Sequence, residues 1–250
     1  MNGKKNKVAL VIGGNSGIGS ACTKQLMDDG FFVCSTYFNN QDKLENLTKD
    51  KQYFNQLSLH HLDVSNGDNT IEVISKIKNE FDSIDVILIS VAPELKNKQI
   101  FDLRWEDYSH HIELQIKPIH FAVKALEDQI RSEVKAKFIV ILTEYCFSKP
   151  PKRLADYVTS KYSALGISKV MATELAQFGS TVNMVSPGMV DTSLLKNIPA
   201  KLIEITAYEN PLKRIASVAD VSSVVSFLAS EKSDYLNGVN ITVNGGGVII

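Results

Sequence analysis

The sequence predicts an α/β protein in which helices cover both faces of one doubly wound parallel sheet of about seven strands. Two observations lead to this class: short apolar runs alternate with longer amphipathic stretches, and a glycine-rich turn follows the first apolar run. The 250 residues are enough for one domain with a substantial core, and no repeat or linker divides them. We therefore predict a single domain over residues 1–250.

Seven short apolar runs are the predicted strands. They cover residues 8–12, 32–37, 58–62, 86–90, 138–142, 182–185 and 241–243. The segments between them are long enough for the helical crossovers that parallel strands require. Between the first two runs, Ile18, Cys22 and Leu26 recur at helical spacing and Gly30 provides a stop. The chain thus opens with a strand, a turn, a helix and a strand, the unit that binds dinucleotides.

Composition argues against several classes of protein. The chain has 44% hydrophobic and 22% charged residues and a formal net charge of -1, without the basic excess that holds a nucleic-acid backbone. Three separated cysteines fit a reducing compartment, and the first apolar run is too short for a signal peptide or a membrane span. We expect a cytoplasmic protein that binds neither nucleic acid nor a membrane. The histidines lack the spacing of a metal site, so no metal is predicted.

The glycine-rich turn has the sequence IGGNSGIG. Glycines between a strand and a helix allow a tight turn and bring backbone N–H groups close to a pyrophosphate, which the helix N-terminus also favours. A purely structural turn is the alternative, because the spacing GxxxGxG differs from the dinucleotide fingerprint GxGxxG. The candidate cofactor-binding residues in the turn are Gly13, Asn15, Ser16, Gly17, Ile18 and Gly19.

Further motifs follow in a fixed order, and with the glycine turn they resemble the short-chain dehydrogenase/reductases, a family with a Rossmann-type fold. YVTSK matches the family's catalytic YxxxK, LDVSN its adenine-contacting segment, and PGMVDT the PGxVxT that borders the nicotinamide. SVAP replaces the family's NNAG beside the cofactor. The resemblance covers nearly the whole chain. It includes the 3-oxoacyl carrier-protein reductases, but it is family-wide and does not indicate that this protein shares their substrate. It implies as further cofactor-binding residues Asp63, Val64, Ser90, Ala92, Pro187, Gly188, Val190 and Thr192.

The YxxxK motif places Tyr157 and Lys161 four residues apart, so on a helix both side chains lie on one face. A phenol can give its proton to the oxygen that gains charge during hydride transfer. A nearby ammonium lowers the pKa of the phenol and holds the ribose. We predict Tyr157 as the acid/base and Lys161 as its activator, both also in contact with the cofactor.

The other two positions of the family's catalytic tetrad are atypical. Glu144, thirteen residues before Tyr157, stands where the substrate-binding serine belongs, and Thr143 is one position earlier. A carboxylate facing a developing alkoxide opposes carbonyl reduction, so Glu144 must be protonated, turned away or otherwise employed. Gln115 stands where the family has an asparagine that organises a water chain to the lysine. Its longer amide side chain could keep that relay with altered geometry.

The end of the second strand indicates which nicotinamide cofactor is used. An acidic residue there would bind the ribose hydroxyls and repel a 2′-phosphate, but Tyr37 occupies this place. The possible donors to a phosphate are Ser35, Asn39, Asn40 and Lys43. We therefore favour NADP(H) over NAD(H), with Tyr37 and Asn39 among the cofactor-binding residues.

Three functions are compatible with these motifs. We predict an oxidoreductase that interconverts a ketone and a secondary alcohol, with Tyr157 as acid/base. The first alternative is dehydratase-type chemistry with Glu144 as a base. Extended relatives of the family carry out such chemistry, but they have an additional substrate domain, and this chain looks too short to contain one. The second alternative is a cofactor-binding scaffold or sensor without catalysis. The substrate class stays open.

The least patterned stretch is residues 193–213, directly after the sixth strand. Because open α/β sheets bind ligands at that edge, we predict that this segment covers the substrate. An ordinary pair of surface helices is the alternative. The family resemblance also implies a homo-oligomer, either a tetramer or a dimer.

Overall fold

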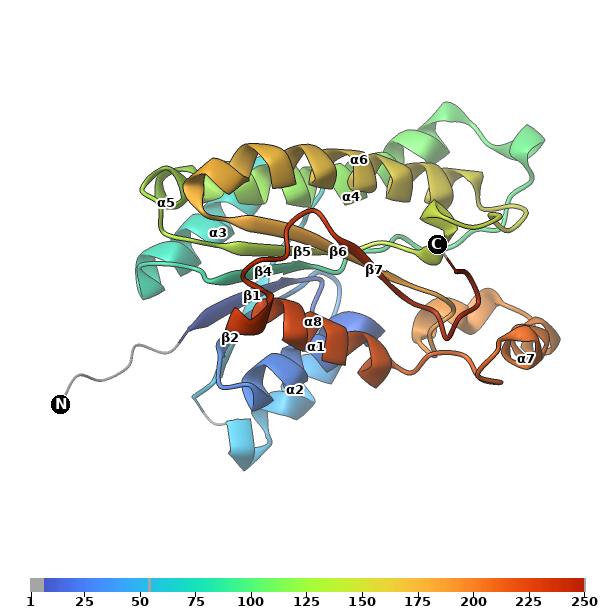
Figure 1. Cartoon of the computed structure of the whole chain (residues 1–250), viewed down its shortest axis with the longest axis horizontal. Helices are drawn as coiled ribbons and strands as arrows, with labels where there is room; N and C mark the ends of the chain where they lie inside the picture. The colour runs from blue at the N-terminus through green and yellow to red at the C-terminus, as the bar shows by residue number, and fades with distance from the viewer. Residues whose placement is uncertain (1–6, 54, 250) are drawn as a thin grey trace.

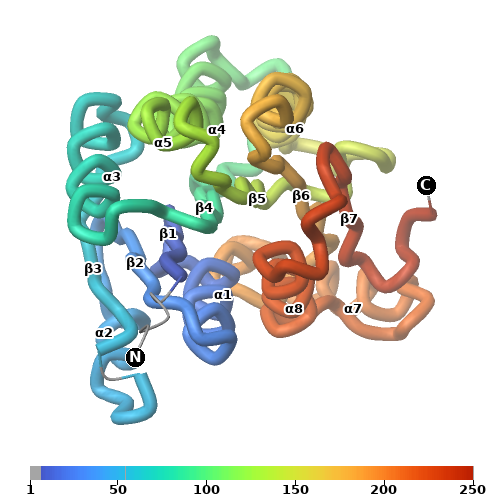
Figure 2. The backbone as a smooth tube through the Cα atoms, turned by 60° about the vertical axis from the view of Figure 1, so that its left-hand side comes forward, coloured from blue at the N-terminus to red at the C-terminus, as the bar shows by residue number. Residues whose placement is uncertain are grey.

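The computed structural model describes residues 7–53 and 55–249, and its described part has the predicted architecture. The strands form one parallel sheet, and helices cover both of its faces (Figures 1 and 2). In chain order the strands are β1 (Val8–Ile12), β2 (Phe32–Tyr37), β3 (Leu57–His61), β4 (Val86–Ile89), β5 (Lys137–Ile141), β6 (Thr181–Pro187) and β7 (Asn240–Val243). All seven were predicted, and their ends differ from the prediction by two residues at most.

The helices occupy the segments between the strands, as predicted. They are α1 (Gly17–Asp28), α2 (Asp42–Thr48), α3 (Gly67–Phe81), α4 (Trp105–Ala125), α5 (Glu127–Arg131), α6 (Ala155–Leu175), α7 (Ala200–Glu209) and α8 (Val218–Ala229). Helices α3, α4 and α6 cover one face of the sheet, and α1 and α8 cover the other (Figure 2). The α/β class with a doubly wound sheet is confirmed.

The core consists of two apolar layers, one on each face of the sheet. In the first layer, Ile74, Ile119 and Ala164 from α3, α4 and α6 are fully buried. In the second, Leu26 from α1 and Val225 from α8 are fully buried. Central strands of such a sheet are covered on both faces, which is why their sequences are continuous apolar runs rather than alternating ones.

The strand order determines where a ligand can bind. The order β3-β2-β1-β4-β5-β6-β7 places β4 next to β1, so the chain crosses over at this point and then builds the sheet in the opposite direction. The loops that follow β1 and β4 diverge there and leave a crevice at the carboxyl edge. The glycine-rich turn follows β1 at this edge, and the SVAP segment follows β4.

Helices α4 and α6 lie side by side over the sheet (Figures 1 and 2). The first turn of α6 is held by Asp156, whose Oδ1 accepts the backbone N–H of Tyr157 at 2.8 Å. After β6, the segment predicted to cover the substrate forms a 3-10 turn, η5 (Ser193–Asn197), followed by α7. In the described part of the chain, no helix is both long and apolar enough to span a bilayer.

Candidate active site

A pocket of about 450 Å³ opens at the carboxyl edge of the sheet, between the loops that follow β1, β4, β5 and β6. It brings together twelve of the residues predicted from the sequence: Ser16, Gly17, Ile18, Ser90, Ala92, Thr143, Tyr157, Lys161, Pro187, Gly188, Val190 and Thr192. Outside its lining lie Gly13, Asn15, Gly19, Tyr37, Asn39, Asp63, Val64, Gln115 and Glu144. Residues as far apart in sequence as Ser16 and Thr192 thus meet because parallel strands end at one edge.

The glycine turn forms one wall of the pocket, and its glycines are required by close approaches. A Cβ atom on Gly13, whose φ is +86°, would lie 2.6 Å from the Ser90 carbonyl oxygen. A Cβ on Gly17 would lie 2.6 Å from Cγ2 of Thr192. The Ser16 hydroxyl accepts the Gly19 N–H at 2.9 Å and caps α1. This backbone cradle at a helix N-terminus has the shape and polarity that a pyrophosphate needs.

The loop after β2 is fastened to the glycine turn by Asn15. Its Oδ1 accepts the backbone N–H of Lys43 at 3.1 Å, and its amide nitrogen donates to Asn40. Lys43, Asn39 and Asn40 are exposed at this edge. The side chain of Tyr37 packs edge-on against His61 at 5.7 Å between ring centroids. A cofactor whose adenosine end lay here would meet one lysine and no carboxylate from β2.

Ser35 is not available to a cofactor, and the prediction that it could donate to a phosphate was wrong. The side chain is fully buried, and its hydroxyl lies 3.0 Å from that of Thr23 on α1. Side chains alternate along a strand, so Ser35 faces the helix that covers β2 rather than the carboxyl edge.

Asp63 and Val64 lie just after β3 and have local partners. Oδ1 of Asp63 accepts the N–H of Ser65 at 2.9 Å and its hydroxyl at 2.7 Å. Val64 packs against the core layer that α3 and α4 form. Asp63 lies just beyond the carboxyl end of β3, and its contact with adenine stays a prediction; the side chain of Val64 packs in the core.

Tyr157 and Thr143 face each other inside the pocket. Both side chains are buried, with 8% and 4% of their surface exposed. Burial raises the pKa of the Tyr157 phenol, and a hydrogen bond with the Thr143 hydroxyl opposes this increase. Thr143 is separated from the end of β5 by one residue, Leu142, so it is at the carboxyl edge and adjacent to the residues that follow β6. The two hydroxyls thus lie within hydrogen-bond distance of each other inside the pocket.

Lys161 lies one helical turn beyond Tyr157, with its ammonium 5.9 Å from the centre of the phenol ring. Nζ donates to Oε1 of Gln115 at 2.8 Å and to the Ile141 carbonyl at 2.9 Å. A longer contact of 3.5 Å joins it to the Val91 carbonyl. Burial lowers the pKa of Lys161 to about 8. The cation is therefore held behind the phenol at a pKa near neutrality.

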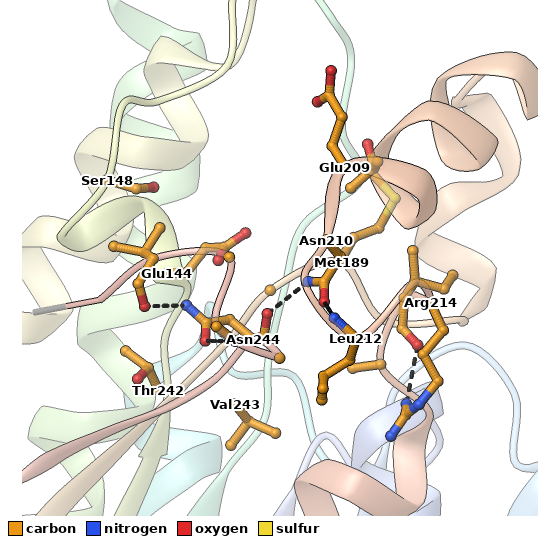
Figure 3. Close-up of a pocket in the computed structure, with 18 of the residues that line it drawn as sticks. Glu144, Ser148, Met189, Glu209, Asn210, Leu212, Arg214, Thr242, Val243 and Asn244 are labelled. Carbon is orange, nitrogen blue, oxygen red and sulfur yellow. Dashed lines mark hydrogen bonds between the residues drawn. The ribbon is translucent and has the colours of Figure 1, made fainter.

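Glu144 is turned away from this pocket. It lines a different cavity of about 680 Å³, which also contains Asn244, Glu209 and Arg214 (Figure 3). A Cβ atom on Gly188 would lie 3.2 Å from Oε1 of Glu144, so the carboxyl group packs against the backbone that follows β6. Burial raises the pKa of Glu144, and a hydrogen bond with Asn244 opposes the shift. The sequence left Glu144 to be protonated, turned away or otherwise employed, and in the structure its side chain is turned away from Tyr157.

The reason for this orientation is a 3-10 turn, η3 (Glu144–Cys146), that begins directly after Thr143. Thr143 is still extended, with φ -158° and ψ 149°, and its hydroxyl caps the turn by accepting the Tyr145 N–H at 3.4 Å. The chain reverses its course at the next residue. The hydroxyl of Thr143 therefore faces Tyr157, and the carboxylate one residue later faces the opposite side.

The pocket has an apolar wall that sequence reasoning missed. Leu95, Leu154 and Tyr157 belong to a small buried cluster, and the side chains of Tyr145 and Leu194 pack against it. Leu154 and Tyr157 are both at the start of α6, but Leu95, Tyr145 and Leu194 come from three other segments, so no single spacing in the sequence joins the set. The wall borders the place where a substrate would approach the Tyr157 phenol.

Only the first part of the segment 193–213 lines the pocket. The residues of η5 do so, and Nδ2 of Asn197 donates to Oε1 of Glu94, another lining residue, at 3.1 Å. Thr206 and Glu209, on α7, line the cavity that contains Glu144.

Comparisons with known proteins agree with this arrangement. A family model described as enoyl-(acyl carrier protein) reductase matches residues 12–247. The 3-oxoacyl-[acyl-carrier-protein] reductase of Staphylococcus epidermidis is 30% identical over 242 residues, which cover 96% of this chain and 98% of the relative. The corresponding reductase of Thermotoga maritima is 27% identical, with coverage of 98% and 99%.

Solved structures share the fold. The structure of ElxO with NADP bound has a TM-score of 0.86 and 24% identity, and the match covers 97% of this chain and 98% of that one. The NADPH-dependent reductase YwfH, involved in bacilysin biosynthesis, has a TM-score of 0.88 and 23% identity, with coverage of 98% and 99%. With the family model matching over almost its full length, the chain belongs to the short-chain dehydrogenase/reductase family of oxidoreductases.

Proposed function

We propose that this protein is an NADPH-dependent reductase of neutral, apolar ketones, with Tyr157 as the proton donor. The observation that carries the proposal is the convergence of the Thr143 and Tyr157 hydroxyls in one pocket, with the Lys161 ammonium directly behind the phenol. The same pocket is continuous with the glycine cradle, whose close backbone approaches suit a pyrophosphate.

NADPH in the cradle would supply the hydride that adds to the carbonyl carbon. The hydroxyls of Thr143 and Tyr157 hold the carbonyl oxygen, which gains negative charge as the hydride arrives. Tyr157 then gives its phenol proton to that oxygen, and the product is the secondary alcohol. The positive charge of Lys161 stabilises the phenolate that remains. Glu144 lies outside this pocket, so the geometry gives no support to the dehydratase-type alternative.

The pocket wall defines the substrates to test. A substrate that reaches Tyr157 passes Leu95, Leu154 and Leu194, and burying an ionised group against such a wall is costly. We expect kcat/KM for ethyl acetoacetate to exceed that for acetoacetate by at least about 10-fold, because the two share a ketone and differ in charge. The measurement is NADPH consumption with each compound. A higher value for acetoacetate would contradict the neutral substrate class.

The cofactor preference is expected to depend on Lys43, the exposed lysine of the loop after β2. We expect NADPH to bind more tightly than NADH, and Lys43→Ala to reduce this preference by about 10- to 100-fold, since a charge-assisted hydrogen bond contributes roughly 1.5–3 kcal/mol. Titrations followed by nicotinamide fluorescence measure both affinities. Lys49→Ala, at the far end of α2, is the matched control. Equal affinities for the two cofactors would rule out the NADP(H) assignment.

The homo-oligomer, the cytoplasmic location and a substrate-covering role for residues 193–213 stay predictions. Exposed apolar side chains on α4 and α6, among them Trp105, Tyr162 and Val170, are compatible with a subunit contact.

A further inference from the structure

The first turn of α6, which carries Tyr157, depends on one acidic side chain. The residue before the helix is Leu154, whose side chain makes no capping hydrogen bond, and Asp156 is the acidic residue of the first turn. Its Oδ1 accepts the backbone N–H of Tyr157 at 2.8 Å. The helix dipole also favours a carboxylate at this end of a helix. The backbone of the proposed proton donor is therefore tied to the side chain of its neighbour.

The other oxygen of this carboxylate faces His111 on α4. Oδ2 of Asp156 lies 3.5 Å from Nε2 of His111, and the two side chains have 5% and 2% of their surface exposed. The distance is longer than that of a usual hydrogen bond, but water hardly screens the attraction between two groups buried to this extent. A carboxylate can only accept, so the favourable arrangement has the imidazole proton on Nε2. Helices α4 and α6, which lie side by side (Figure 1), are thus joined by a polar contact one residue before Tyr157.

The surroundings of His111 favour a neutral ring. Asp156 faces it from α6, His110 and Asp107 from its own helix, and Lys96 from the loop after β4. Burial lowers the pKa of His111, and His110 and Lys96 act in the same direction, whereas Asp156 and Asp107 oppose the decrease. A second proton would sit on Nδ1, which is buried and has no hydrogen-bond partner among the described residues. Since a buried N–H without an acceptor is costly, the imidazole donates through Nε2 alone.

We propose that His111 is a positioning residue that acts through Asp156 on the catalytic phenol of Tyr157. This inference rests on the proposed function. The imidazole holds the carboxylate, the carboxylate holds the first turn of α6, and the turn keeps the phenol opposite the Thr143 hydroxyl. Without the imidazole N–H, the carboxylate turns toward water, because a buried charge without a partner is costly. The first turn of α6 then follows it, and the phenol is displaced.

The position of the pair outside the pocket makes this role separable from binding. Neither His111 nor Asp156 lines the active-site pocket, so neither side chain meets a ketone or a nicotinamide there. An effect of His111 on the reaction must therefore pass through the helix that carries Tyr157. Such an effect should appear in kcat, with little change in KM or in the affinity for NADPH.

Two amide substitutions of His111 form a matched pair. The side-chain nitrogen of glutamine can occupy the place of Nε2, whereas that of asparagine reaches only the place of Nδ1, away from Asp156. The test compares His111→Gln, His111→Asn, Asp156→Ala and the double variant His111→Asn/Asp156→Ala with the wild-type protein. His120→Asn is the control, since His120 lies on the same helix with an exposed side chain. For each protein, kcat and KM with ethyl acetoacetate, the NADPH dissociation constant and the melting temperature are measured.

His111→Asn should lower kcat by about 10- to 100-fold, the effect of a displaced catalytic group. KM and the NADPH dissociation constant should stay near the wild-type values, and His111→Gln should retain most of kcat. Asp156→Ala should lower kcat as much as His111→Asn does. In the double variant, the His111 substitution should add less than about a further 2-fold, because two residues that act in series are not additive. His120→Asn should change none of these quantities.

Three results would overturn the positioning role while leaving the proposed function intact. They are a wild-type kcat in His111→Asn, equal kcat losses in His111→Gln and His111→Asn, and a double variant in which the two single losses multiply. If Asp156→Ala does not fold, the comparison of His111→Gln with His111→Asn decides alone. A wild-type protein that does not reduce ethyl acetoacetate with NADPH would instead overturn the proposed function, and the positioning role with it.

Discussion

Tyr157→Phe is expected to lower the rate of ketone reduction by about 100- to 10 000-fold, the usual contribution of a positioned proton donor. NADPH affinity should remain close to the wild-type value, because the variant keeps the ring that packs against Leu95 and Leu154 and loses only the hydroxyl. The measurement combines NADPH consumption under saturating ketone with a fluorescence titration of NADPH.

Tyr162→Phe is the control for this variant. Tyr162 lies on the same helix, but its side chain is about half exposed, so its loss should change neither quantity. Tyr157→Phe separates the enzyme from a scaffold or sensor, since a scaffold retains its ligand and has no turnover to lose. If the variant reduced ethyl acetoacetate as fast as the wild-type protein, the proton would come from another group.

The central strands were predictable because their burial is complete. All five residues of β1 are buried, and the strand had the predicted ends. The edge strand β3 is less distinct: its residues are only partly buried or exposed, and the observed strand starts one residue before the predicted one. Leu62, included in the prediction for its apolar side chain, is buried beyond the end of the strand. An edge strand has one uncovered side, so its apolar pattern marks its limits less well.

Within the site, sequence spacing was informative wherever one regular element carries the residues. Tyr157 and Lys161 lie on α6, and the helical period alone places them on one face. The glycine cradle follows in the same way from the strand-turn-helix unit. Gln115 and Lys161 are 46 residues apart, and only the packing of α4 on α6 brings the amide within 2.8 Å of the ammonium. The amide therefore contacts the ammonium directly, which spacing in the sequence could not predict.

The choice between Thr143 and Glu144 could not be made from spacing. Counting back from Tyr157 selects Glu144, but the count passes through η3 and an irregular loop, where a single residue decides which side of the chain faces the pocket. In a strand, adjacent side chains point to opposite faces, so an error of one position exchanges a hydroxyl for a carboxylate. The dihedral angles at Thr143 resolve this, since they keep it extended before the turn begins.

Thr143→Val is therefore expected to lower kcat/KM for ketone reduction by about 100- to 1000-fold, the effect of removing one donor to a developing oxyanion. Valine has nearly the shape of threonine, so the buried position stays filled, and Thr143→Ser should restore most of the activity.

Glu144→Gln should retain activity because its side chain lies in the other cavity. Burial raises the pKa of Glu144, so its ionisation at pH 7 opposes folding, and the glutamine variant should melt at the same temperature or higher. Loss of turnover in Glu144→Gln, with Thr143→Val fully active, would mean that residue 144 supplies the catalytic group and that its side chain faces Tyr157 during the reaction.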